Sequence, residues 1–227
     1  MSVITIQIGE RYYSKDPQST ELGRKIISAS IELLDQLGFE EFTFKKLAES
    51  IGSTEASIYR YFENKLKLLV YLTSWYWAWL EYMIDYQTHH IQDKALKLKE
   101  IIKILCHADQ GNLSMDLPGV NTVCLRHVVV SESDKTYLTK KVDEINNQGL
   151  FMGFKSLCHK IAVTISAISP SFEYPHAVAS TILEASHQQA FFALHLPSLT
   201  EIRRDSQESV EIQVYHFIDS LISKLLK

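Results

Sequence analysis

The chain has 227 residues, of which 46% are hydrophobic and 22% charged, and its formal net charge is −4 at pH 7. A chain of this length and composition buries enough surface to fold without cross-links, which excludes disordered, collagen-like and disulfide-scaffold proteins. Three cysteines without CxxC spacing indicate neither a disulfide framework nor a zinc site, so a reducing compartment is expected.

Residues 1–18 are predicted to form an N-terminal arm. Only the first eight residues alternate as a strand does, and a lone strand needs a partner, either locally or in another subunit. This N-terminus lacks the basic and apolar regions of a secretory signal. The most apolar run, residues 68–80, is shorter than the roughly 20 residues of a membrane helix. We therefore expect a cytoplasmic protein without a membrane partner.

Beyond the arm, the sequence predicts an all-α protein, because long stretches contain few glycines or prolines. Helical spacing begins at Ser19, and Gly38 is placed to end this first helix. Its predicted buried face consists of Leu22, Ile26, Ala29, Leu33 and Leu37. Thr43 is expected to cap a short second helix.

Ala48, Gly52 and Ile58 have the spacing of a helix-turn-helix unit. A small residue is needed where the two helices cross, a residue tolerant of positive φ in the turn, and an apolar residue pointing back into the angle. Thr54 is expected to cap the second of these helices, predicted over residues 55–62. The alternative is a tight αα-corner of the kind found in many helical proteins.

The stretch 24–69 resembles the N-terminal domain of the tetracycline-repressor-like (TetR) family of transcriptional regulators. The resemblance rests on Ile26, Ala29, Leu33, Gly38-Phe39, Thr43, Leu47-Ala48, Gly52 and the run 57–65, SIYRYFENK. It implies a three-helix helix-turn-helix DNA-binding domain over residues 19–64. It also implies a helical effector-binding and dimerisation domain over residues 65–227.

As a DNA reader, the helix beginning at Glu55 would enter the major groove, with Ser57 and Arg60 reaching base edges. The other expected DNA-binding residues supply hydroxyls, cations or the helix cap: Thr43, Lys45, Lys46, Thr54, Tyr59, Tyr61 and Lys65. Lys65 follows a helix N-terminus and is the strongest candidate for a phosphate contact. The lysine pair could instead be solvated, and Arg60 could pair with Glu55 or Glu63.

The DNA-binding region is not basic. Residues 1–65 contain eight Lys or Arg and ten Asp or Glu. Because nonspecific affinity depends on phosphate neutralisation, we expect weak binding to bulk DNA and dependence on a dimer at a specific operator.

A long helix is predicted from Asn64 to about His89. Its aromatic residues suggest a wall for a hydrophobic or aromatic effector, with core packing as the alternative. The expected ligand-binding residues are Trp79, Tyr82, Met83, Tyr86 and His127. Within this helix, Trp75, Trp79, Tyr82 and Tyr86 are predicted to share one stripe.

Further helices are predicted at about 93–109, 119–132, 135–168, 176–195 and 207–226, with breaks at Gly111, at Pro118-Gly119 and at residues 169–175. Gly149 and Gly153, inside the third of these helices, suggest close packing or a kink. The last two are expected to form half of a four-helix bundle across a two-fold axis, the alternative being that they cover only their own core. Cys and His are too scattered to predict a metal site, and no cofactor or catalytic motif stands out.

The sequence therefore predicts a homodimeric, ligand-responsive repressor that binds a palindromic double-stranded operator and is not an enzyme. The alternative is a TetR-like helical module that carries a hydrophobic ligand or lipid without binding DNA.

Overall fold

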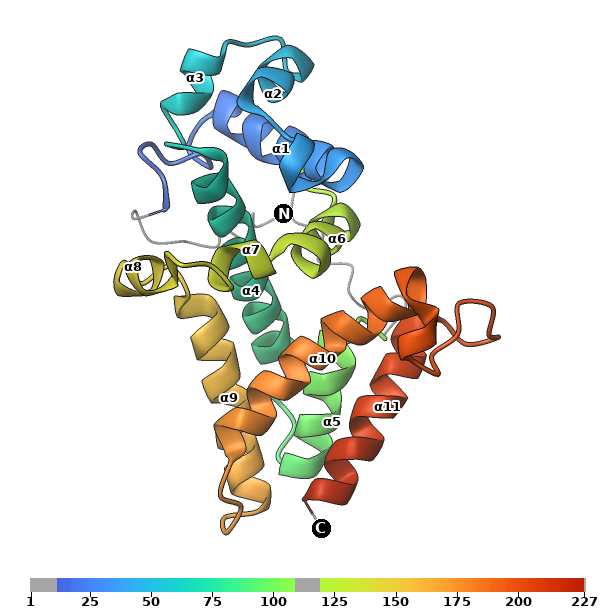
Figure 1. Ribbon diagram of the computed structural model, residues 1–227. Helices are drawn as coiled ribbons and strands as arrows, with labels where there is room; N and C mark the ends of the chain where they lie inside the picture. Colours follow the sequence, from blue (N-terminus) through green and yellow to red (C-terminus); the bar gives the residue numbers. More distant parts are fainter. Residues whose placement is uncertain (1–11, 109–118, 227) are drawn as a thin grey trace. The chain divides into compact units, whose positions relative to one another are not determined.

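A computed structural model describes residues 12–108 and 119–226, which are helical and contain no strand (Figure 1). The strand predicted in residues 1–8 and the break predicted at Gly111 lie outside the described residues. The chain divides into two compact units, Met1–Ala78 with Met115–Gly153, and Trp79–Ser114 with Phe154–Lys227. This division differs from the predicted domains at 19–64 and 65–227, which remain a prediction.

In the first unit, α1 (Glu21–Glu41) begins where the Thr20 side chain accepts a hydrogen bond from the Gly23 amide, and it kinks at Gly38, where φ is 72°. The predicted buried face is confirmed at Ile26 and wrong at its end, where Leu37 is 37% exposed. Leu22, Ala29 and Leu33 are only half-buried, and the fully or nearly fully buried positions besides Ile26 are Ile27, Ser30, Ile31 and Leu34. Apolar residues occur on several sides of α1, and its contacts with α2 and α6 decide which side is buried.

Two short helices follow, α2 (Phe44–Ser50) and α3 (Glu55–Tyr59). The long helix α4 (Lys65–Thr88) then begins after Asn64, whose side chain accepts a hydrogen bond from the Lys67 amide at 2.9 Å. Its residues up to Ala78 belong to the first unit and the remainder to the second. The predicted long helix is thus confirmed to within a residue or two at each end.

The first unit continues with α6 (Thr122–Glu132), α7 (Asp134–Tyr137) and α8 (Val142–Asn147), and α9 (Met152–Ile168) follows. The single helix predicted over 135–168 is therefore wrong. Gly149 has a φ of 73°, and the Leu150 amide beyond it donates to the Ile145 carbonyl, which terminates α8. Leu150 is fully buried in this unit, so burial of that side chain accompanies the chain reversal.

The second unit contains α5 (Lys94–Leu105), most of α9, α10 (Pro175–His195), the short η2 (Pro197–Leu199) and α11 (Val210–Leu225). α10 and α11 pack on each other and on α5, as Figure 1 shows. Buried residues of α10 include Ile182, Leu183, Ser186 and Ala190, so this predicted packing stripe is covered by the unit's own core. No helix of the described ranges is long and apolar enough to span a bilayer.

Candidate nucleic-acid interface

The turn between α2 and α3 has helix-turn-helix geometry. Thr43 caps α2 by accepting from the Lys46 amide, and Thr54 caps α3 by accepting from the Ser57 amide. Between the helices, Gly52 has a φ of 63°, which favours glycine. Ala48 is buried at the crossing and Ile58 is fully buried below it. The predicted roles of this triple are confirmed.

A group of polar side chains lies on the outward side of the α2–α3 unit, and no other part of the described ranges covers it. Thr43, Lys45, Thr54 and Arg60 are exposed, and Tyr59 is 52% exposed with its ring edge on Phe44. The Arg60 side chain forms no ion pair or hydrogen bond with any described residue, including the glutamates considered above.

Ser57 lies at the margin of this surface. It is half-buried, and its hydroxyl lies 3.0 Å from that of Thr54. The helix itself is shorter than predicted, because α3 ends at Tyr59 and Arg60 is its C-cap. The expected base-reading residues Ser57 and Arg60 thus lie in the short helix and at its C-cap, and their role stays a prediction.

Tyr61 and Lys46 are two of the expected phosphate ligands. Tyr61 is 3% exposed and its hydroxyl lies 2.8 Å from the Thr20 hydroxyl, so both the ring and its polar atom are occupied within the unit. The Lys46 ammonium donates to the Glu41 carbonyl at 2.7 Å and lies 3.5 Å from the Glu41 carboxylate. Both side chains thus have partners within the unit, and their expected phosphate contacts stay predictions.

Lys65, the strongest phosphate candidate in the sequence, is also satisfied internally. Its ammonium lies 2.8, 3.1 and 3.3 Å from the carbonyl oxygens of Phe39, Glu40 and Phe42. An ammonium has three donors, and these carbonyls accept all of them. The side chain therefore holds the end of α1 and the segment leading into α2 in this structure without DNA, and its expected contact with phosphate stays a prediction.

Glu132 of α6 holds the same segment from a second direction. Its carboxylate accepts a hydrogen bond from the Phe39 amide at 2.9 Å and another from Lys135 at 2.6 Å. The hydrogen bond to Glu132 raises the pKa of Lys135, whose ammonium also lies 3.4 Å from Glu40. The sequence analysis missed Glu132. The available signal was its position at the end of the apolar run VVVSE, because an acidic side chain in an apolar segment is buried only where it accepts a hydrogen bond.

The five expected ligand-binding residues differ in their surroundings, and their role stays a prediction. Trp79 and Met83 are buried, whereas Tyr82 and Tyr86 are exposed and stack on each other with centroids 6.3 Å apart. The predicted stripe holds in its geometry, because Trp75, Trp79, Tyr82 and Tyr86 share one side of the continuous helix α4, but burial changes along it from the two buried tryptophans to the two exposed tyrosines. His127 lies in the first unit, where its ring nitrogen is 3.2 Å from the Asp35 carboxylate.

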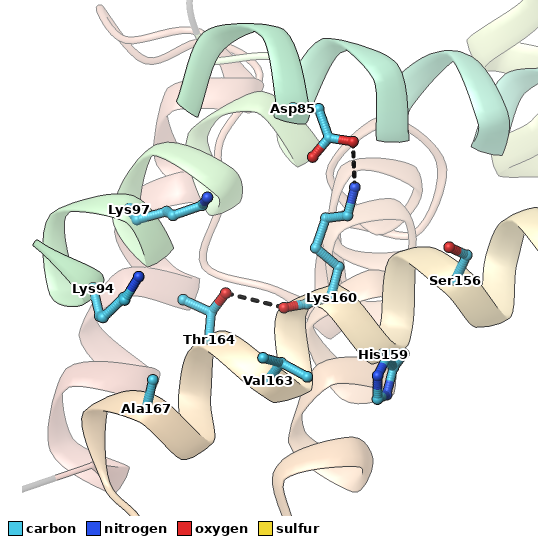
Figure 2. A pocket seen from close by; sticks show the side chains of 9 residues that line it. All are labelled: Asp85, Lys94, Lys97, Ser156, His159, Lys160, Val163, Thr164 and Ala167. Atoms are coloured by element: carbon cyan, nitrogen blue, oxygen red, sulfur yellow. Dashed lines mark hydrogen bonds and ion pairs between the residues drawn. The ribbon is translucent and has the colours of Figure 1, made fainter. Parts of the chain in front are cut away.

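A pocket of about 390 Å³ lies within the second unit instead, between the end of α4, the start of α5 and the middle of α9 (Figure 2). None of the predicted ligand-binding residues lines it. The residues with charged or imidazole side chains that do so are Asp85, Lys94, Lys97, His159 and Lys160. The spacing of the two α5 lysines was the available signal, since residues three apart share a helix face.

Comparison with known proteins gives one family match and several similar folds. Residues 26–72 match the family model of the bacterial regulatory proteins of the tetR family. Comparison with curated protein sequences gives no match.

Three solved structures illustrate the similarity of fold. AibR in complex with isovaleryl coenzyme A and operator DNA is 14% identical, with a TM-score of 0.59, and the match covers 93% of this chain and 97% of AibR. The fatty acid degradation regulator FadR from Bacillus halodurans is 16% identical, with a TM-score of 0.59 and coverage of 95% and 96%. A transcriptional regulator from Rhodococcus sp. RHA1 is 15% identical, with a TM-score of 0.62 and coverage of 93% and 96%.

Proposed function

We propose that this chain is a DNA-binding transcriptional regulator of the tetR family, acting as a homodimeric repressor that a small molecule releases from a palindromic operator. The observation that carries the proposal is the exposed polar side of the α2–α3 unit. There, Lys45, Tyr59 and Arg60 lie outward while Ile58 and Ala48 fix the unit from below.

In this proposal, the exposed residues divide into two roles. Arg60 has its guanidinium free of described partners, and a guanidinium reads guanine by donating to O6 and N7 in the major groove. Lys45 and Thr43 lie at the start of α2, where a cation and a hydroxyl suit phosphate. Tyr59 supplies a further exposed hydroxyl for the DNA backbone.

An apolar stripe on α11 supports the dimer. Phe217, Leu221 and Leu225 recur every four residues and are 43%, 43% and 46% exposed. The intervening Ile218 and Ile222 are buried in the core of the second unit, so α11 is apolar on two sides. Pairing this stripe with its symmetry mate would cover it and bring two readers onto one operator. The proposed interface thus uses the outer side of α11, while most of the apolar face of α10 stays in its own core.

The effector part of the proposal draws on the fold. AibR, which shares this fold, has been solved with an acyl-coenzyme A and operator DNA together. Release of this chain from its operator would require a coupling free energy of about 1–3 kcal/mol between effector and DNA sites.

The test is fluorescence anisotropy with a labelled duplex from the intergenic DNA upstream of the chain's own gene, compared with a scrambled duplex. Arg60→Ala is expected to weaken binding to the upstream duplex about tenfold or more, corresponding to ~1–3 kcal/mol, and to leave the scrambled duplex unaffected. Lys45→Met should weaken binding to both duplexes alike. It should also lower the slope of log affinity against log salt concentration by about one. Lys99→Met, an exposed lysine of α5 in the second unit, is the matched control.

Absence of salt-dependent binding would contradict the proposed function and favour a helical module that carries a hydrophobic ligand. Full affinity in the Arg60 variant would contradict the base-reading role of Arg60. Leu221→Asp tests the dimer separately, by analytical ultracentrifugation. The variant should sediment as a folded monomer, and an unchanged dimer would place the interface elsewhere.

A further inference from the structure

The pocket of the second unit is lined by three helices that contribute different chemistry. Lys94 and Lys97 come from the first turns of α5, Lys160 from α9 and Asp85 from α4, as Figure 2 shows. Its volume of about 390 Å³ lies near the lower end of the ~300–1,000 Å³ typical of small-molecule sites. The pocket is therefore suited to a small ligand rather than to a complete coenzyme A thioester.

The three lysines differ in how their charge is compensated. The Lys160 ammonium lies 2.5 Å from the Asp85 carboxylate and 3.2 Å from that of Glu81. Lys94 and Lys97 form no ion pair or hydrogen bond with any residue in the described part of the chain. The pocket therefore contains two cations without a protein counter-charge, in a chain whose net charge is negative.

Neighbouring polar groups do not neutralise these two lysines. The Asp93 carboxylate accepts hydrogen bonds from the Ala95 and Leu96 amides at 2.8 and 3.0 Å, as the cap of α5. The Thr164 hydroxyl donates to the Lys160 carbonyl at 3.0 Å. The two unpaired charges left for a ligand are thus cationic, and the one lining carboxylate is already paired, so the pocket favours an anion over a cation or a neutral molecule.

The wall of α9 adds an apolar part to this cationic site. Val163 and Ala167 line the pocket one helical turn apart, and the Val163 side chain is half exposed to it and to solvent. A ligand with an anionic group at one end and a short hydrocarbon chain at the other would satisfy both parts.

We propose that this pocket binds a small organic anion, a carboxylate or phosphate ester, with its charged group between Lys94 and Lys97 and its apolar chain against Val163 and Ala167. Its role as the effector rests on the regulatory function proposed above, whereas binding itself does not.

Isothermal titration calorimetry of the full chain without DNA tests the site with four probes that share one hydrocarbon chain. Hexanoate and hexyl phosphate carry the two candidate anions, 1-hexanol is neutral and hexylammonium is cationic. At least one anion is expected to bind at least tenfold more tightly than 1-hexanol and hexylammonium, and the tighter anion identifies the headgroup. The double variant Lys94→Ala/Lys97→Ala should lose at least tenfold in affinity for that anion. Lys99→Ala, on α5 but outside the pocket, should not, and circular dichroism checks that both variants fold.

Equal binding of all four probes, no binding of either anion, or full affinity in the double variant would overturn the site. The anion is then added at saturation to the complex with the upstream duplex. Anion binding that depends on both lysines but leaves DNA binding unchanged would uphold the site and contradict its role as effector site. A chain that binds the anion and no DNA would contradict the function proposed above while leaving the site intact.

Discussion

The DNA-reading region and the pocket of the second unit are built by different kinds of interaction. Each of the four successive helices α1 to α4 begins with a side-chain cap, from Thr20, Thr43, Thr54 and Asn64. These caps act between residues a few positions apart, and more distant hydrogen bonds from Lys65 and Glu132 to Phe39 add to them. The pocket instead joins side chains from residues 85 to 167, which meet only through packing of α4, α5 and α9. Local caps thus set the start of each helix in the DNA-binding region, whereas the pocket depends on long-range packing throughout.

The largest effect that tests this contrast is expected from Ile58→Ala. Ile58 is fully buried beneath the α2–α3 turn, so truncation should lower the free energy of unfolding by about 2–5 kcal/mol and abolish DNA binding. The equally buried Ile165→Ala of α9 should have a similar effect on stability measured by urea denaturation. Where both variants remain folded, only the first should lose operator affinity. Equal loss would mean that the reader does not depend mainly on its own local packing.

The next effect separates two lysines that the sequence alone treats alike. Lys65→Met removes the donor to three carbonyl oxygens and should lower the free energy of unfolding by about 1.5–3 kcal/mol. Lys45→Met, at an exposed position, should change it by less than about 0.5 kcal/mol while weakening DNA binding. Urea denaturation of both variants decides the assignment. An unchanged midpoint for Lys65→Met would favour its predicted phosphate role.

A smaller effect is expected at the turn itself. An added Cβ at Gly52 meets no atom within 4 Å, so Gly52→Ala is destabilising only through its φ of +63°, by about 1–2 kcal/mol. The measurement is the thermal midpoint, with Gly153→Ala as comparison. Gly153 lacks a positive φ, and its added Cβ would make only ordinary contacts, at 3.5 Å. A larger loss for Gly153→Ala would show that packing, rather than backbone conformation, limits substitution here.

The smallest effect compares one thiol from each unit. Burial and, secondarily, the neighbouring Asp35 raise the pKa of the Cys124 thiol to about 11, whereas burial alone raises the pKa of Cys158. Alkylation of Cys124 by iodoacetamide should therefore accelerate about tenfold per pH unit below pH 11, since the thiolate is the nucleophile. Asp35→Asn should lower the Cys124 pKa and speed its alkylation at pH 8 without affecting Cys158. Mass spectrometry of both peptides gives the two rates, and equal acceleration would indicate general loosening instead.

The sequence predicted those features whose causes are local. Gly52, the threonine caps and the small residue at position 48 each act within one turn, and the structure confirms them. The single helix expected over 135–168 failed because two internal turns are stabilised by burial of residues such as Leu150, which periodicity does not reveal.

The internal partners of several predicted site residues could not be foreseen for a related reason. A basic or aromatic side chain next to a reader helix has the same appearance in sequence whether it faces DNA or its own protein. Tyr61 and Lys65 find partners in Thr20 and Phe39, at least 26 positions away. In α4, aromatic residues occur on more than one side of the helix, so the sequence does not show which side is buried. The lysines of the pocket come together only when α5 and α9 pack.

The backbone amide and carbonyl of Phe39, in the DNA-binding region, are hydrogen-bonded to side chains of opposite charge. The Phe39 amide donates to Glu132 of α6, and the Phe39 carbonyl accepts from Lys65 of α4. A hydrogen bond to a charged group contributes about 1.5–3 kcal/mol, which matches the free energy by which effectors commonly change the affinity of a distant site. Breaking one such bond is therefore energetically sufficient to switch occupancy of a promoter, without unfolding any helix.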